Sequence, residues 1–154
     1  MKPVIYIETT IFSILVDTRP ESVYRRRWTM DWWRSQRQRF DLYTSPFVVD
    51  ELNVPVYPGW QKAMAIVRRQ KLLAVTDDLP GIIRVYIDNL LMPQGDEGDA
   101  AHLAMASIHE ADYLLTWNCR HLANANKFEH IRAINRRLGL LTPEIVTPEQ
   151  LFKE

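Results

Sequence analysis

Short apolar runs alternate with longer helical patterns along the chain, and this alternation constrains the fold more than any other feature. The first run, Val4–Ile7, is rich in β-branched residues and is typical of a strand buried in a sheet. The intervals between runs contain helical patterns, as parallel strands require for their crossovers. The sequence therefore predicts an α/β fold, a three-layer α/β/α sandwich with a mostly parallel central sheet. The expected strands are Val4–Ile7, Asp41–Thr44, Leu72–Val75, Tyr113–Thr116 and Glu144–Val146.

Helical periodicity and terminal residues predict the helices between these strands. Thr9 or Thr10 is expected to cap the first helix, Ser45 the helix that begins at Pro46, and Asp96 an alanine-rich helix. No linker, internal repeat or low-complexity segment interrupts the pattern, so residues 1–154 are expected to form a single domain. The expected helices cover residues 11–15, 22–39, 46–52, 60–70, 77–91, 96–110 and 124–138.

The composition excludes several classes of protein. With 47% hydrophobic residues, 5 glycines and 9 prolines, the chain is neither collagen-like nor largely disordered. No apolar run approaches the roughly 20 residues that span a bilayer, and Glu8 interrupts the amino terminus before a signal-like core develops. The single cysteine, Cys119, cannot form an internal disulfide, which favours a reducing compartment. We therefore expect a cytoplasmic protein that does not contact a membrane.

The net charge of zero is the sum of two unlike regions. Residues 18–40 carry seven arginines against two acids, whereas residues 77–112 carry eight acids against one arginine. This asymmetry predicts separate basic and acidic surfaces on one fold. The arginine-rich region also contains Tyr24, Trp28 and Trp32 at four-residue spacing, which predicts a helix face that lies mostly in the core or in an interface. Plain solvation of the arginines remains an alternative.

Four oxygen-bearing side chains lie just past the expected strands or on the helices beside them, and Glu51 is near the end of its helix. They are Glu8, Glu51, Asp99 and Asn118. Because ligand sites in open α/β sheets form at the carboxyl ends of strands, these side chains are candidates for one cleft. Such a ligand set suits Mg²⁺ or Mn²⁺. Each residue also has a plain alternative, as a strand-end acid, a solvated acid, a helix-start acid and a turn residue respectively.

The order and spacing of these motifs resemble those of the PIN-domain ribonucleases, specifically the VapC-like toxins of toxin–antitoxin pairs. Tyr6–Ser13 resembles the opening motif, an acid followed by two hydroxyl residues, and Thr44–Leu52 resembles the segment that supplies the second acid. Asp99–Ala106 resembles the helix of the third acid, and Tyr113–Leu122 resembles the fourth motif. The resemblance spans nearly the whole chain, from Val4 to the Thr147–Leu151 tail.

The sequence departs from the family pattern at two of these positions. Glu8 stands where the family usually has aspartate, and Asn118 stands where the fourth acid usually lies. The amide leaves a cluster charge of −3 from Glu8, Glu51 and Asp99, which weakens binding of a second metal more than binding of the first. Asp96, one helical turn before Asp99, is a candidate for the missing charge.

The resemblance implies an endoribonuclease that depends on Mg²⁺ or Mn²⁺ and hydrolyses RNA phosphodiester bonds. It implies Glu8, Glu51 and Asp99 as metal ligands, with Asn118 as a weaker ligand or a holder of water. Thr10, and with less support Thr9 or Thr116, would orient ligands or phosphate through hydrogen bonds. The implied partners are an RNA substrate, a cognate antitoxin protein that covers the early helices, and a second copy in a homodimer. Arg25, Arg26 and Arg27 are candidates for contact with RNA or with the antitoxin.

Two other functions fit the same residues. The first is a non-catalytic PIN-like domain that binds RNA or serves as a scaffold, which the neutral Asn118 favours. The second is a structure-specific DNA nuclease of the flap-nuclease type, although such chains are usually much longer. A zinc hydrolase lacks its usual ligand spacing here, so His102 is expected to be packed or hydrogen-bonded and Cys119 to be incidental.

Overall fold

A single five-stranded sheet forms the centre of the protein, in the order β3-β2-β1-β4-β5. The computed structural model describes residues 1–154, and all four strand pairs in it are parallel. In the central strand, Ile5 pairs with Leu42 on one side and with Tyr113 on the other. The α/β class and the parallel sheet are confirmed. The strands are β1 (Val4–Ile7), β2 (Asp41–Thr44), β3 (Lys71–Leu72), β4 (Tyr113–Leu115) and β5 (Glu144–Val146).

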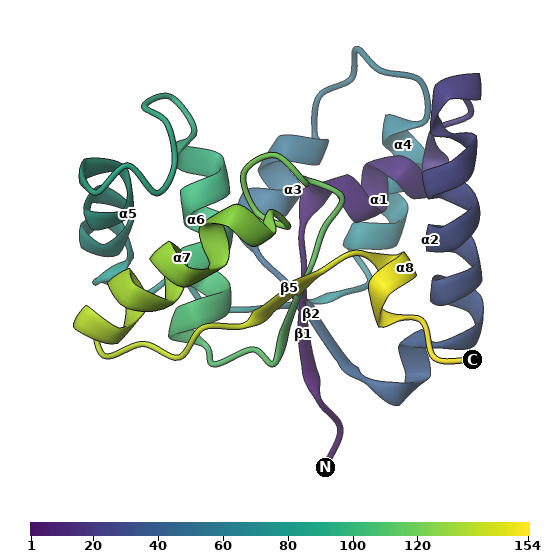
Figure 1. Cartoon of the computed structure of the whole chain (residues 1–154). Helices are drawn as coiled ribbons and strands as arrows, with labels where there is room; N and C mark the ends of the chain where they lie inside the picture. Colours follow the sequence, from purple (N-terminus) through teal and green to yellow (C-terminus); the bar gives the residue numbers. More distant parts are fainter.

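The helices form one layer on each face of this sheet. They are α1 (Thr9–Val16), α2 (Val23–Ser35), α3 (Pro46–Leu52), α4 (Trp60–Val67), α5 (Leu79–Asp88), α6 (Glu97–Ile108), α7 (Ala125–Arg137) and α8 (Pro148–Leu151). The chain steps from β1 outward to β2 and β3, then returns past β1 to β4 and β5. Because βαβ crossovers are right-handed, this reversal puts the two groups of connecting helices on opposite faces. Figure 1 shows α5, α6 and α7 on one face and α1, α2, α4 and α8 on the other.

The core is built around β1 and α6. Ile5, Tyr6 and Ile7 are fully buried, which explains why β1 is a continuous apolar run rather than an alternating one. Small side chains such as Ala100 and Ala104 let α6 pack closely, and every residue from Ala100 to Ser107 is buried. None of the helices combines the length and the apolar character needed to cross a membrane.

Several predicted boundaries were wrong, because local turns end the elements early. The helix expected over 22–39 stops at Ser35 and gives way to a short 3₁₀ turn at Arg37–Arg39. The helix expected over 77–91 covers only Leu79–Asp88, and Leu90 adopts a left-handed backbone conformation after it. The third strand is Lys71–Leu72, two exposed residues at the sheet edge, rather than 72–75. Helix α8, which a capping box at Thr147 begins, was not predicted.

The helix caps also differ from the prediction. Glu8 caps α1 by accepting a hydrogen bond from the backbone of Thr10, while Thr9 is already the first helical residue. Ser45 and Asp96 occupy the expected cap positions before α3 and α6, but neither side chain makes a capping hydrogen bond. The Ser45 hydroxyl and the Asp96 carboxylate can therefore make contacts other than capping hydrogen bonds.

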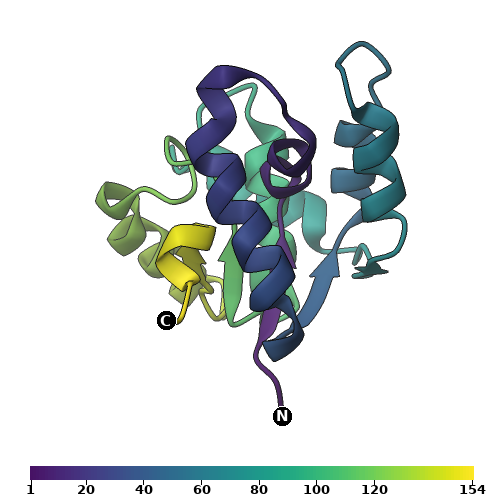
Figure 2. The same cartoon turned by 90° about the vertical axis from the view of Figure 1, so that its right-hand side faces the viewer.

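The aromatic stripe of α2 lies only partly in the core. Trp32 is fully buried and stacks on Phe40, and Trp28 packs edge-on against Phe152 beside α8. Tyr24 is 60% exposed, so it does not lie in the core, and the prediction of a mostly buried face fails at this residue within the single chain. Figure 2 shows α2 along the outer face, with α8 next to it.

A buried hydrogen bond between α5 and α7 provides a test of the helical layer. The Tyr86 hydroxyl donates to Asn135 Oδ1 at 2.5 Å, and burial raises the pKa of Tyr86 to about 12. Tyr86→Phe should lower the free energy of unfolding by about 1–2 kcal/mol at pH 7, because it leaves a buried carbonyl oxygen unpaired. The difference from wild type should shrink as the pH rises from 10 toward 12, where the wild type loses the contribution of its neutral phenol.

Chemical denaturation of wild type and Tyr86→Phe, at pH 7 and again between pH 10 and about 12, measures the difference in their free energies of unfolding. Tyr43→Phe is the matched control, since the Tyr43 hydroxyl makes no hydrogen bond and the ring is only half-buried. Equal stability of the two variants at pH 7 would contradict the assignment.

Candidate functional site

The reversal in strand order creates the position for a site. The chain leaves β1 toward β2 in one direction and reaches β4 on the other side, so the loops after β1 and β4 diverge at the carboxyl edge of the sheet. Crevices at such points bind ligands in open α/β folds. Glu8 follows β1 directly, Thr116 follows β4, and Ser45 leads from β2 into α3.

Glu8 is the most buried acid at this edge, with 3% of its surface exposed. Its Oε1 accepts hydrogen bonds from the Thr10 backbone at 3.1 Å, the Thr10 hydroxyl at 2.5 Å and the Thr116 hydroxyl at 2.6 Å. Burial raises the pKa of Glu8, although His102 and the two threonines act in the opposite direction. Glu8 is therefore a strand-end acid whose hydrogen-bond partners are threonines, and no ion pair with an arginine neutralises it.

The two threonines also fix the loop after β4. Thr10 Oγ1 accepts from the Trp117 backbone at 2.8 Å, and Thr116 Oγ1 accepts from the Asn118 backbone at 2.9 Å. Each hydroxyl therefore donates to Glu8 and accepts from this loop. These contacts are compatible with the orienting role expected of Thr10 and Thr116, which stays a prediction.

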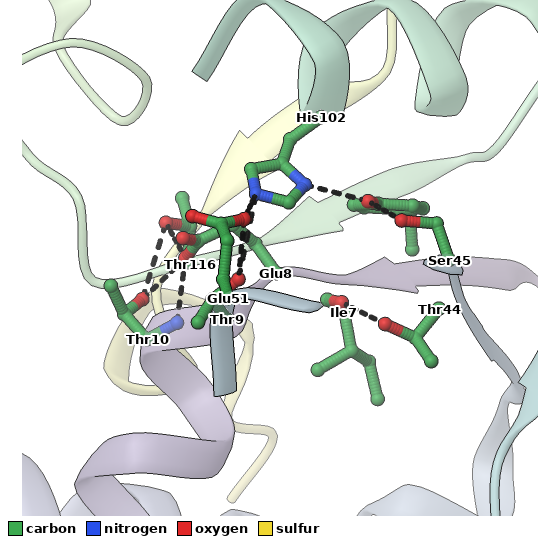
Figure 3. A network of polar contacts seen from close by, with 10 residues as sticks. Ile7, Glu8, Thr9, Thr10, Thr44, Ser45, Glu51, His102 and Thr116 are labelled. Carbon is green, nitrogen blue, oxygen red and sulfur yellow. Dashed lines mark hydrogen bonds and ion pairs between the residues drawn. The ribbon is translucent and has the colours of Figure 1, made fainter. Parts of the chain in front are cut away.

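Glu51 lies in the last turn of α3 and belongs to a second hydrogen-bonded group. Its Oε1 accepts from the Thr9 hydroxyl at 3.0 Å and is also bonded to His102 Nε2. His102 is fully buried and hydrogen-bonded, as predicted, but its partner is one of the candidate metal ligands. Figure 3 shows His102 reaching from α6 to Glu51, with Glu8, Thr10 and Thr116 beside them.

The other ring nitrogen of His102 is bonded to Tyr6, which in turn is bonded to Ser45, and sequence reasoning missed both residues. The Tyr6 hydroxyl lies 2.7 Å from His102 Nδ1 and 2.7 Å from Ser45 Oγ, and all three side chains are fully buried. Two signals were available in the sequence. Tyr6 is the one polar-tipped residue in an otherwise aliphatic strand, and Ser45 stands at a cap position.

His102 is electrostatically coupled to three acids. Burial alone would lower the pKa of His102, but the hydrogen bond to Glu51 and the charges of Glu8, Glu51 and Asp99 raise it. Burial alone would raise the pKa of Glu51, yet His102 and Thr9 bring it below its ordinary value. The pKa of Asp99 is raised by burial, against the effects of Asn118 and His102. The three predicted ligands thus share one neighbouring imidazole.

Asp99 also belongs to a cluster with Asp96 and His121. The ligand atoms of Asp96, Asp99 and His121 all lie within 4.8 Å of one another, and His121 Nε2 is 3.3 Å from Asp96 Oδ2. Asn118 connects this cluster to the loop after β4, because its Oδ1 accepts a hydrogen bond from the His121 backbone at 3.0 Å and its side chain acts to lower the pKa of Asp99. Sequence reasoning missed His121, which stands only three residues after Asn118.

The predicted ligands Glu8, Glu51 and Asp99 do not form a group as tight as this cluster. Glu8, Glu51 and Asp99 can bind one ion together only if their side chains move closer to one another. The oxygen donors nevertheless fit Mg²⁺ or Mn²⁺, because carboxylate and amide oxygens are hard ligands. Glu51 Oε2 has no hydrogen-bond partner and faces Gly98, where an added Cβ would lie 3.7 Å away.

Cations also lie beside the acids. Lys127, at the start of α7, donates to the His121 carbonyl at 3.0 Å, and its charge is coupled to Asp96 and Asp99. Burial lowers the pKa of Lys127, while these two acids act to raise it. Sequence reasoning missed this residue because its helix is remote in sequence from the acids.

The three consecutive arginines of α2 do not act as one patch. Successive helical residues point about 100° apart, and the three side chains have different neighbours. Arg25 lies over the Trp117 ring at 5.5 Å, next to the site, whereas Arg26 donates to the Leu15 carbonyl at 3.2 Å. Arg27 lines one surface groove with Tyr24 and Trp28, and it lines a second groove together with Arg26. Arg25 lines neither groove.

No protein-family model matches the chain, and no curated protein matches it either. The likeness to PIN-domain ribonucleases therefore stays a prediction from the order of the sequence motifs. In the structure, side chains of these motifs lie at one edge of the sheet. These positions define a candidate site of acids, hydroxyls and imidazoles.

The burial of Glu8 has a cost that can be measured. Because its pKa is raised above 4.5 in the folded protein, the wild type is most stabilised by this group below pH 4.5 and loses that contribution as the pH rises. Glu8→Gln should therefore increase the free energy of unfolding by about 1 kcal/mol at pH 7 in EDTA, as often happens at strained functional sites.

Denaturation of wild type and Glu8→Gln between pH 7 and 4.5 measures the difference in their free energies of unfolding. This difference should become smaller as the pH approaches 4.5. A Glu8→Gln variant that is less stable than wild type at pH 7 would contradict this interpretation. Glu97→Gln, at an exposed position, is the control.

Proposed function

We propose that the protein is an endoribonuclease of the PIN-domain type that depends on Mg²⁺ or Mn²⁺. The observation that carries the proposal is the buried carboxylate of Glu8, held by three hydrogen bonds at the carboxyl end of the central strand. Glu51, Asp99 and Asn118 come to the same edge from three other segments, in the order that the resemblance predicts. The charges of Glu8, Glu51 and Asp99 all act on His102, which supports a shared site.

The residues divide the work of phosphodiester hydrolysis between them. Glu8, Glu51 and Asp99 would hold the ion, with Asn118 as a weaker oxygen ligand and Asp96 supplying additional negative charge. The bound ion would supply Lewis acidity, which makes an attacking water more acidic and neutralises charge on the phosphate. Thr10 and Thr116 keep Glu8 oriented, and no nucleophilic side chain is required.

The partners follow from the same proposal. The substrate is RNA, and the cations beside the site are Arg25, which lies over the Trp117 ring, and Lys127, whose charge interacts with Asp96 and Asp99. We expect the protein to act in the cytoplasm. An antitoxin protein would inhibit the enzyme by covering the early helices, where Val23 and Tyr24 are exposed. A homodimer would complete the assembly, as in the toxins that the chain resembles.

Asp99→Asn provides the direct test of catalysis. The substitution preserves shape but removes one of the three ligand charges, so Mn²⁺-dependent cleavage of an RNA mixture should fall at least a hundredfold while the melting temperature in EDTA changes little. Glu97→Gln, in the same turn of α6 but exposed to solvent, should keep full activity. Undiminished cleavage by Asp99→Asn, measured by gel electrophoresis, would refute the assignment.

The arginines can be separated by the salt dependence of RNA binding. In the inactive Asp99→Asn background, Arg25→Ala should reduce the slope of log K against log salt by about 0.7, the value for one phosphate contact with single-stranded RNA. Arg27→Ala should leave the slope unchanged, because Arg27 lies on another face of α2. Fluorescence anisotropy from 50 to about 300 mM salt measures both. An unchanged slope for Arg25→Ala excludes RNA contact there.

A second candidate function is a non-catalytic domain of the same type that binds RNA or serves as a scaffold. The observation that favours it is the wider separation of Glu8, Glu51 and Asp99 compared with the Asp96 cluster, together with the neutral Asn118. Calorimetric titration of the wild type with Mn²⁺ distinguishes the two. Absence of binding that depends on Glu8 and Glu51 would favour the scaffold.

A further inference from the structure

A buried chain of hydrogen bonds leads from Ser45 through Tyr6 to His102 and ends on Glu51. Its side-chain contacts are 2.7 Å from Ser45 Oγ to the Tyr6 hydroxyl and 2.7 Å from that hydroxyl to His102 Nδ1, followed by the bond from Nε2 to Glu51. Each of the first three residues is fully buried. Because such groups cost free energy unless they are paired, the chain specifies one arrangement of its members.

The protons in this chain have two consistent orders when Glu51 is ionised. In one, Ser45 donates to Tyr6, Tyr6 donates to Nδ1 of a neutral imidazole, and the remaining proton is on Nε2. In the other, an imidazolium donates from both nitrogens, and Tyr6 donates to Ser45. Both orders place an N–H of His102 against Glu51 Oε1.

The two oxygens of Glu51 therefore have different tasks. Oε1 accepts from His102 and from the Thr9 hydroxyl at 3.0 Å. Oε2 has no protein partner and faces Gly98, the residue before Asp99. Holding one oxygen by two donors fixes the rotation of the carboxylate and leaves the other oxygen free on the side of Asp99.

We infer that His102, supported by Tyr6 and Ser45, is the positioning residue that orients Glu51 toward a divalent cation. The inference rests on the proposed function. It also explains why Ser45, at the cap position of α3, does not cap the helix: its hydroxyl bonds to Tyr6 instead. The chain of bonds connects three segments: β1, which Glu8 follows directly; the β2–α3 junction, where the helix that carries Glu51 begins; and α6, which carries Asp99.

Mn²⁺ binding by purified variants tests the inference, with isothermal titration calorimetry as the readout. His102→Leu removes the donor to Glu51 and should weaken Mn²⁺ binding by about 10- to 100-fold, the usual effect of losing a residue that orients a ligand. His102→Gln keeps an amide N–H near the position of Nε2 and should recover most of that affinity. Tyr6→Phe leaves Nδ1 unpaired and should fall between wild type and His102→Leu.

A matched control separates positioning from stability. Ser107→Ala removes a buried hydroxyl from the same helix, where it bonds to the Leu103 carbonyl and to Asn135, away from Glu51. This variant should lose melting temperature but bind Mn²⁺ as wild type does. If His102→Leu fails to fold, Tyr6→Phe still measures the same chain of bonds.

The outcomes distinguish this inference from the proposed function. Wild-type protein that does not bind Mn²⁺ would refute the proposed function, and the inference with it. Wild-type binding together with unchanged affinity in Tyr6→Phe and His102→Leu would refute the inference alone. A His102→Gln variant that binds no better than His102→Leu would also refute it, because a hydrogen-bond donor at that position would then have no effect.

Discussion

The hydrogen bonds to Glu8 are the interactions on which the rest of the site depends. They join the end of β1, the first turn of α1 and the residue after β4 through a single carboxylate oxygen. Because Thr10 and Thr116 also accept hydrogen bonds from the loop after β4, the position of Asn118 is linked to that of Glu8. A buried charge is costly, so this arrangement sacrifices stability to keep an acid at the carboxyl edge of the sheet.

The architecture was predictable because it follows from local periodicity. The apolar strand Val4–Ile7 and the alanine-rich helix at Asp99 needed no knowledge of distant contacts, and both elements are present. The caps were not predictable in the same way. Ser45 has the properties of a helix cap, but a tyrosine 39 residues away binds its hydroxyl. Propensity describes a residue and its neighbours in sequence, and such long-range partners override it.

Prediction of the candidate site had the same limit. The acids could be identified because each lies just past a strand or on a helix beside one. His102, His121 and Lys127, by contrast, enter the site only through the packing of α6, the loop after β4 and α7. These residues also show why the net charge of zero does not describe the electrostatics of the site. The acidic edge carries its own cations and donors, so its local field depends on their placement and not on the total.

Anomalous diffraction from crystals grown with Mn²⁺ tests the central claim most directly, because it locates the ion without reference to activity. The proposed function predicts one strong manganese peak at the carboxyl edge of the sheet, coordinated by oxygens of Glu8, Glu51 and Asp99. A peak bound only by Asp96 and His121, or no peak at this edge of the sheet, would contradict it.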